Sequence, residues 1–281
     1  MKQFALICLA VVFASVSFGA SVIRVLPADT IQSRFSRVHA KNEERAAELE
    51  KLFKEAGCDA NSYSEDRILS SKLPNIECAL AESGKRTVVV SAHFDNRGPG
   101  EGAIDNWSGA SLLPSLFESL KGSPHRLTFE FIGFTDEEKG LIGSRDYVGH
   151  LSKEHRANIL LNVNIDCVGL PGRIRVWAGR ADNLLLTSAA EVADRTGIFV
   201  AADTLDQNRY DSDAGAFIAW NIPVIDFHSL TQDTLRLLHS KRDVRTAIDP
   251  KSYYDHYRFL AAYLAYLDEV LDTGERLTVE R

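Results

Sequence analysis

The stretch VVVSAHFDNRGPGEGAIDNWSG, from Val88 to Gly109, holds the part of the sequence that decides the fold. Its first residues are apolar and β-branched, which predicts a buried strand that ends where the polar residues begin. His93 and Asp95 lie at that end, and a glycine-rich loop then leads to Asp105 at the start of an expected helix. Ligands bind at the carboxyl ends of strands in open α/β sheets, and imidazole and carboxylate groups bind Zn²⁺. This stretch therefore predicts a metal site.

Three further strand candidates carry acidic residues or a histidine at the same end. The runs FEFIGF, ILLNVNI and IPVIDF are followed by TDEEKG, by Asp166 and by His228, respectively. One His-x-Asp after a strand is more often a hydrogen-bonded surface pair than a set of ligands. Four strand ends of this kind are difficult to explain as solvated surface, so we interpret them as one site at the edge of a sheet.

The order of strands and helices predicts the fold class. Strand candidates near 87–92, 127–134, 159–165 and 222–227 are separated by helical stretches, which predicts an α/β fold, a single α/β/α sandwich with a mixed, mainly parallel central sheet. Further strands are expected at 173–178 and 199–202, and a hairpin at 58–66 and 74–82. Helices are expected at 28–57, 105–120, 140–151, 183–196 and 253–271, with Pro114 inside the second of them. Residues 204–215 are polar and are expected to form a loop.

These segments together resemble the di-zinc aminopeptidases of clan MH. That family includes aminopeptidase S, aminopeptidase Y and the bacterial leucyl aminopeptidases, and glutaminyl-peptide cyclotransferase is a relative. The matching segments lie in the family's order between about residues 74 and 228. They are AHFD, GAIDNWSG, FTDEEKGLIGS, NVNIDCVG, and YDSDAGAF with the following NIPVIDFH.

The resemblance implies two zinc ions per chain. Asp105 would be the carboxylate that bridges them, although a helix N-cap is the alternative role for this residue. His93 and Asp166 would complete one zinc site, and Glu138 and His228 the other. Each zinc would keep open positions for water and substrate, as catalytic sites do.

The same resemblance implies roles for three further side chains. Glu137 would take the proton of the water that bridges the metals and pass it to the leaving amine. Asp95 would accept a hydrogen bond from the imidazole nitrogen of His93 that does not face the metal. Tyr210 is a candidate donor to the developing oxyanion or to the substrate.

We therefore expect a secreted zinc metallo-aminopeptidase that hydrolyses the N-terminal residue of peptides with a free N-terminus. One alternative is an enzyme like glutaminyl-peptide cyclotransferase, whose known members work with a single zinc ion. Another is a non-catalytic binding domain on the same fold, because fold alone does not establish function.

Composition and the N-terminus indicate an exported globular protein. With 281 residues, 45% hydrophobic and 25% charged, the chain fits one globular domain, and its net charge of −7 indicates neither nucleic acid nor an anionic membrane as a partner. The apolar run FALICLAVVFASVSF after Met1 and Lys2 is typical of a signal peptide. We expect a signal peptide at 1–19, a catalytic domain at 20–281 and a secreted or periplasmic location. The run is shorter than the roughly 20 residues of a membrane span, so none is expected in the mature form.

Export affects the interpretation of the cysteines. Cys8 would leave with the signal peptide, and an oxidising compartment would favour a disulfide among the rest. Cys58 follows the first long helix and Cys78 lies on the next strand, so these two are the expected pair. Cys167 is expected to be a small buried residue rather than a zinc ligand.

Overall fold

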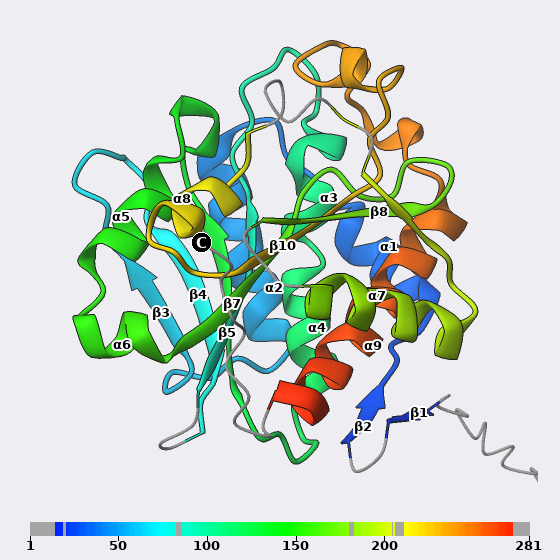
Figure 1. The fold of residues 1–281 in the computed structure, drawn as a ribbon. Helices are drawn as coiled ribbons and strands as arrows, with labels where there is room; N and C mark the ends of the chain where they lie inside the picture. The colour runs from blue at the N-terminus through cyan, green and yellow to red at the C-terminus, as the bar shows by residue number, and fades with distance from the viewer. Residues whose placement is uncertain are drawn as a thin grey trace, which may run out of the picture.

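The computed structural model describes residues 15–18, 21–82, 86–179, 183–203, 205 and 211–271. Its centre is an eight-stranded sheet, and a separate antiparallel pair is formed by β1 (Ser15–Phe18) and β2 (Ser21–Arg24) (Figure 1). The strands of the sheet are β3 (Tyr63–Asp66), β4 (Asn75–Leu80), β5 (Thr87–His93), β6 (Thr128–Phe134), β7 (Ile159–Ile165), β8 (Ile174–Gly179), β9 (Val200–Ala202) and β10 (Val224–His228). Their order across the sheet is β3-β4-β6-β5-β7-β10-β8-β9.

Parallel strands form the middle of this sheet. β6, β5, β7 and β10 are parallel neighbours, so their carboxyl ends lie along one edge. β3 and β4 form the antiparallel hairpin expected from the sequence, and β8 is antiparallel to β10. The prediction of a mixed, mainly parallel sheet is confirmed.

Helices cover both faces of the sheet, which confirms the predicted α/β/α sandwich. One face carries α1 (Ala28–Phe35), α2 (Asn42–Glu55), α3 (Ser108–Ala110), α4 (Leu113–Leu120), α7 (Asn183–Thr196) and α9 (Pro250–Val270). The other face carries α5 (Ile142–His150), α6 (Lys153–Asn158) and α8 (Ala214–Ala219), which lie on the left of the sheet in Figure 1. Short helical turns are η1 (Ala103–Trp107), η2 (Glu137–Lys139), η3 (Leu235–Leu237) and η4 (Arg245–Ala247).

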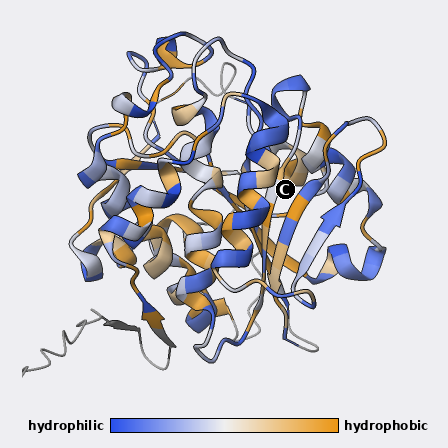
Figure 2. Ribbon diagram, turned by 180° about the vertical axis from the view of Figure 1, so that it is seen from behind, coloured by the Kyte–Doolittle hydropathy of each residue, from blue (hydrophilic) through white to orange (hydrophobic). Residues whose placement is uncertain are grey.

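Strand periodicity explains why two layers of helices are needed. Val88 and Val90 pack into the core on the α9 side, whereas Val89 packs into the core on the α5 and α8 side. Successive side chains of a strand point to opposite faces, so a strand that is apolar throughout must be covered twice. Figure 2 shows the result, with hydrophobic residues on the strands and on the inner faces of the helices.

The helices differ from the prediction in three respects. The helix expected over 28–57 is two helices, α1 and α2, and the second one starts at Asn42. Pro114 lies in the first turn of α4, where a missing N–H costs nothing, and not in a helix interior. α6 and α8 were not predicted, because each has only six residues and is too short for a periodic pattern.

Cys58 and Cys78 form a disulfide that joins the end of α2 to β4, as expected. Cys167 is a free, buried cysteine. Among the described residues, no helix combines the length and the apolar content needed to cross a bilayer. Residues 1–14 and 19–20, which include most of the expected signal peptide, lie outside the described residues.

Replacing both Cys58 and Cys78 by serine should lower the free energy of unfolding by about 3 kcal/mol. The bond closes a loop with a sequence separation of 20, and its loss restores the conformational entropy of that loop to the unfolded chain. Urea unfolding of the variant and of the oxidised protein measures the difference. Reduction of the disulfide in the unchanged protein should lower the free energy of unfolding by the same amount. Unfolding midpoints equal to that of the oxidised protein, for both the variant and the reduced protein, would contradict the prediction.

Candidate metal centre

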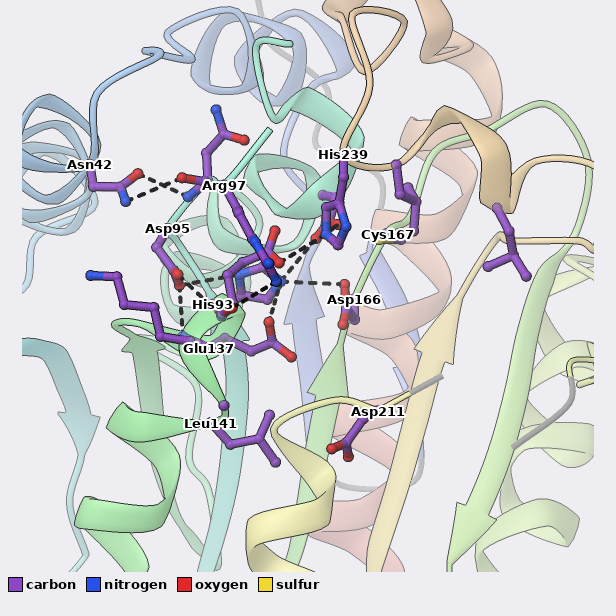
Figure 3. Close-up of a pocket in the computed structure, with 17 residues that line it drawn as sticks. Asn42, His93, Asp95, Arg97, Glu137, Leu141, Asp166, Cys167, Asp211 and His239 are labelled. Atoms are coloured by element: carbon purple, nitrogen blue, oxygen red, sulfur yellow. Dashed lines mark hydrogen bonds and ion pairs between the residues drawn. The ribbon is translucent and has the colours of Figure 1, made fainter. Parts of the chain in front are cut away.

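Two groups of potential metal ligands lie at the carboxyl edge of the parallel strands and share one residue. His93, Asp105 and Asp166 form the first group, and Asp105, Glu138 and His239 form the second. Within each group the potential ligand atoms lie within 4.8 Å of one another. Both groups open into a cavity of about 800 Å³, and Figure 3 shows His93, Asp166 and His239 converging there.

Asp105 lies between the groups and presents one carboxylate oxygen to each. Its Oδ1 lies 3.1 Å from Nε2 of His93, and its Oδ2 lies 3.1 Å from Nε2 of His239. Oε2 of Glu138 lies 2.8 Å from the same nitrogen of His239. The geometry is that of a bridging carboxylate with a separate set of partners on each side.

The parallel strands explain why these side chains meet. His93 is the last residue of β5, Asp166 follows β7, and the Glu137–Glu138 turn follows β6 after Phe134. Because β6, β5 and β7 are adjacent and parallel, the residues after them emerge at one edge. The residues that follow these strands in the sequence therefore lie close together in the structure.

Two side chains hold the Asp105 segment in place. The carboxylate of Asp243 accepts hydrogen bonds from the backbone N–H groups of Ile104, at 2.6 Å, and of Asp105, at 3.3 Å. The amide of Asn106 donates to the Ile165 carbonyl at 2.9 Å and accepts from the Cys167 N–H at 3.0 Å. Asn106 thereby ties the bridging carboxylate to the loop that carries Asp166.

Asp95 organises the turn that carries the two glutamates. Its carboxylate accepts hydrogen bonds from the backbone N–H groups of Glu137, at 3.0 Å, and of Glu138, at 3.3 Å. Its Oδ1 also lies 3.4 Å from Nδ1 of His93, the ring nitrogen that faces away from Asp105. One buried carboxylate therefore holds the backbone of both glutamates and lies beside the imidazole.

The buried guanidinium of Arg45 holds the loop from which the site is built. It donates to the carbonyl groups of Phe94, His39, Glu101 and Gly102. The positive charge lies close enough to Asp95, Asp105 and Glu138 to interact with them electrostatically. Burial lowers the pKa of Arg45 to about 10, which still leaves the group charged at neutral pH.

The electrostatics of the site reflect concentrated negative charge. Burial alone would lower the pKa of His93, but the surrounding carboxylates, Glu137 foremost, raise it well above its usual value. Burial, together with the charges of Asp213, Asp166 and Asp105, raises the pKa of Glu137 to about 9. Divalent cations neutralise charge of this kind.

The donor set fits zinc. It consists of imidazole nitrogen and carboxylate oxygen, which Zn²⁺ takes as ligands. Two buried carboxylate oxygens, Oε1 of Glu138 and Oδ1 of Asp166, have no hydrogen-bond partner among the described residues. Buried polar atoms are normally satisfied, so these oxygens are free to face a cation. The residues present thus fit zinc, and Asp105 belongs to both ligand groups.

Glu137 lies beside both groups and belongs to neither. Its Oε2 is 4.0 Å from Nε2 of His93, and its side chain lines the cavity with 11% of its surface exposed. Asp136, the preceding acidic residue, is turned away, and its Oδ1 pairs with Nζ of Lys139 at 2.7 Å. Of the three adjacent acidic residues, Glu137 is the one beside the ligands without being one of them.

The prediction that His228 completes the second group is wrong. Its Nδ1 accepts a hydrogen bond from the Leu230 N–H at 3.1 Å, so in the neutral ring the proton is on Nε2. That nitrogen faces Oδ1 of Asp203 at 3.2 Å, where both side chains are buried. His228 therefore anchors the segment after β9, and the histidine of the second group is His239.

His239 was missed because it does not follow a strand directly. The chain leaves β10, passes through η3 and returns across the site, where His239 has a φ of 52°. Gly98 permits this return, because a Cβ there would lie 2.9 Å from the Cα of His239. The sequence signal that could have indicated this residue is a histidine four positions before Asp243 in a segment without periodicity.

Two further residues, Tyr210 and Asp213, belong to the segment that precedes α8. Tyr210, the predicted oxyanion or substrate donor, lies outside the described residues. Asp213, to which no role was assigned, is buried and close enough to Glu137 for its charge to raise the pKa of that side chain. Burial raises the pKa of Asp213 itself to about 7.

Comparison with known proteins gives the family. Residues 75–264 match the profile of peptidase family M28. Aminopeptidase YwaD of Bacillus subtilis is 42% identical over 82 residues, a segment that covers 29% of this chain and only 18% of YwaD.

Solved structures have the same fold. The LapA aminopeptidase of Legionella pneumophila superposes with a TM-score of 0.74 at 19% identity, over 86% of this chain and 72% of LapA. BSAP, a zinc aminopeptidase from Bacillus subtilis, superposes with a TM-score of 0.61 at 25% identity, over 68% of this chain and 49% of BSAP. A glutaminyl cyclase from an Acidobacteriales bacterium superposes with a TM-score of 0.71 at 16% identity, over 86% of this chain and 94% of the cyclase. Because the family profile spans more than half of the sequence, the chain belongs to peptidase family M28.

Proposed function

We propose that this protein is a zinc aminopeptidase that removes the N-terminal residue of peptides, with two zinc ions per chain. The observation that carries the proposal is the position of Asp105, whose two oxygens face two different histidines. A carboxylate in that position would hold two cations at once. The family and the names of the similar proteins support peptide hydrolysis.

The chemistry divides between the metals and the side chains of this chain. Zinc ions, when bound, polarise the peptide carbonyl and make water acidic enough to react near neutral pH. Glu137 takes the proton from the attacking water on its carboxylate and gives it to the leaving nitrogen as the C–N bond breaks. Asp95 keeps Glu137 at the right distance through the backbone hydrogen bond of 3.0 Å.

The acidic site also suits the free amino group that defines an aminopeptidase substrate. Six carboxylates line the cavity, those of Asp95, Asp105, Glu137, Glu138, Asp166 and Asp211. A protonated N-terminus is attracted to such a surface, whereas an acylated one has no charge to be attracted. Discrimination against blocked peptides follows from this electrostatic difference.

Removal of zinc should abolish hydrolysis. We expect dialysis against a chelator to lower the hydrolysis of an aminoacyl substrate by at least roughly 10²-fold, because the carbonyl and the attacking water lose their activation. Readdition of zinc should restore the rate, with a plateau at about two ions per chain by elemental analysis. N-acetylated versions of the same substrates are the control and should remain uncleaved. Full activity of the zinc-free protein, or cleavage of the acetylated substrates at the same rate, would rule out this function.

Glutaminyl cyclisation is a second candidate, supported by the similarity to the Acidobacteriales cyclase along 94% of that protein. A peptide with N-terminal glutamine separates the two reactions. A peptidase releases free glutamine, whereas a cyclase releases ammonia and leaves the peptide bond intact. Mass spectrometry of the products distinguishes them, and ammonia release with about one zinc per chain would favour cyclisation.

We also infer that the protein works outside the cytoplasm, in the periplasm or as a secreted enzyme. The apolar N-terminal run supports this inference, and so does the Cys58–Cys78 disulfide, because disulfides persist in oxidising compartments. Expression of the full-length chain followed by N-terminal sequencing of the exported protein is the test. An intact N-terminus on a protein retained in the cytoplasm would contradict it.

A further inference from the structure

We propose that Arg97 binds a carboxylate on the leaving part of the substrate, so that dipeptides and peptides with an acidic second residue are favoured. The inference rests on the proposed peptidase function and adds a substrate class to it. The carboxylate has two possible sources, the C-terminus of a dipeptide and the side chain of an aspartate or glutamate.

Arg97 supplies an exposed positive charge to the cavity. It lies in the loop after Asp95 and lines the cavity together with the ligand groups. In Figure 3 its side chain runs from that loop toward the ligand cluster, and its Nη1 donates to the Glu138 carbonyl at 3.4 Å. This single long hydrogen bond leaves the other guanidinium N–H groups available.

The other basic side chains that line the cavity already have partners. Nζ of Lys139 lies 2.7 Å from Oδ1 of Asp136. The ring of His239 lies between Asp105 and Glu138. Among the described residues, Arg97 has no carboxylate within ion-pair distance. It is therefore the cation of this cavity that can accept a carboxylate from a ligand.

The position of Arg97 assigns it to the leaving side of the peptide. Glu137 must reach the leaving nitrogen to protonate it, so the departing residue extends from the Glu137 side of the site. The guanidinium contacts the carbonyl of Glu138, the next residue in the chain. Since one extended residue spans roughly 3.5 Å, a carboxylate on the second residue stays within the cavity. The apolar lining residues Leu235 and Leu238, which precede His239, suit the uncharged side chain of the first residue.

Electrostatics make such a cation necessary for this substrate class. Bound zinc would neutralise the carboxylates of the two ligand groups, but Asp95 and Glu137 belong to neither group and disfavour the negative charge that a dipeptide always carries. Arginine presents a planar fork of donors that binds a carboxylate through two hydrogen bonds. The Arg97 loop is also held in place, because the Asn96 N–H donates to Oδ1 of Asn42 at 2.9 Å and the Gly98 N–H donates to Oδ1 of Asn96 at 3.0 Å. The loop is therefore ordered before binding, and only the Arg97 side chain has to be immobilised.

Two matched pairs of substrates test the proposal on the zinc-loaded protein. The pair Leu-Ala and Leu-Ala-amide differs in the C-terminal carboxylate, and the pair Leu-Asp-amide and Leu-Asn-amide differs in the side-chain carboxylate. For at least one pair we expect Arg97→Gln to lower the ratio of kcat/KM, charged over uncharged, by about tenfold, which is typical of a lost hydrogen-bonded charge pair. Arg97→Lys should retain part of the preference, because the charge stays and the fork is lost. The pair that responds identifies the source of the carboxylate.

A control variant and the dependence on salt separate direct contact from general charge. Lys51→Gln removes one positive charge from an exposed position on α2 and should leave both ratios unchanged. The preference of the unchanged protein should weaken between low and high ionic strength, because exposed ion pairs are screened.

Unchanged ratios for both pairs in Arg97→Gln would overturn the proposal while leaving the peptidase function intact. A response confined to an acidic first residue, measured with glutamyl and glutaminyl anilides, would overturn it as well. No hydrolysis of any of these substrates by the zinc-loaded protein would instead overturn the proposed function.

Discussion

Replacing Glu137 by glutamine is expected to lower kcat by roughly 10²-fold or more while zinc content and folding stay unchanged. Glutamine keeps the shape of the side chain and its place in the cavity, but it cannot accept and return a proton. The carboxylate lies beside the ligand groups without belonging to either, 4.0 Å from Nε2 of His93. Measurements of kcat, of zinc per chain and of the unfolding midpoint on the same preparation test this.

The adjacent glutamate is the matched control for this substitution. Glu138→Gln should lower zinc occupancy, because Glu138 belongs to the second ligand group and one of its buried oxygens has no other partner among the described residues. The two variants change adjacent residues, yet Glu137→Gln should lose turnover and Glu138→Gln should lose zinc. Turnover near the original rate in fully zinc-loaded Glu137→Gln, or loss of metal in that variant, would contradict the assignment.

Replacing His239 by alanine is expected to reduce zinc from two ions to one per chain and to lower kcat/KM by at least about 10²-fold. His239 is the only nitrogen donor of the second group, and it lies 3.1 Å from Asp105 and 2.8 Å from Glu138. Loss of a residue that merely supports a ligand costs about 10- to 100-fold in metal affinity, and loss of the ligand itself should cost more. Elemental analysis and titration with zinc measure the effect.

His228→Ala is the informative comparison, because His228 was the histidine predicted from the strand pattern. It should retain two zinc ions and instead lower the free energy of unfolding by about 1–3 kcal/mol, since the buried carboxylate of Asp203 loses one of its partners. Loss of one zinc ion from His228→Ala, with full occupancy in His239→Ala, would show that the strand-end residue is the ligand after all.

Strand ends were predictable because their positions depend on local sequence. The run at 159–165 forms β7 with the predicted bounds, and the runs that became β5 and β6 ended within one residue of the prediction. An apolar β-branched run has few alternatives to a buried strand, and adjacent parallel strands must bring their carboxyl ends together. The ends of these strands could therefore be assigned to one site before their distances were known, and the family resemblance then indicated His93, Asp166 and Glu138 within it.

Local irregularities were less predictable. The break between α1 and α2 depends on contacts far along the chain, since the side chain of Asn42, at the start of α2, exchanges hydrogen bonds with the backbone of Asn96. Helical periodicity through 28–57 contains no sign of this pairing. The short α8 likewise forms against α5 and β10, directly after a segment that is polar in sequence.

The sequence by itself determined the layered α/β fold and placed imidazole and carboxylate groups at one edge of its sheet, where four of the five candidate metal ligands lie. These features follow from the periodicity of apolar residues and from the fixed geometry of parallel strands. Only the tertiary structure decided that His239, and not His228, faces Glu138, and that Asp243 and Asn106 hold the bridging carboxylate. The path of a loop depends on where its backbone can pack and find hydrogen-bond partners. Here those partners are distant in sequence: His239 packs against Gly98, and Asp243 accepts hydrogen bonds from the N–H groups of Ile104 and Asp105.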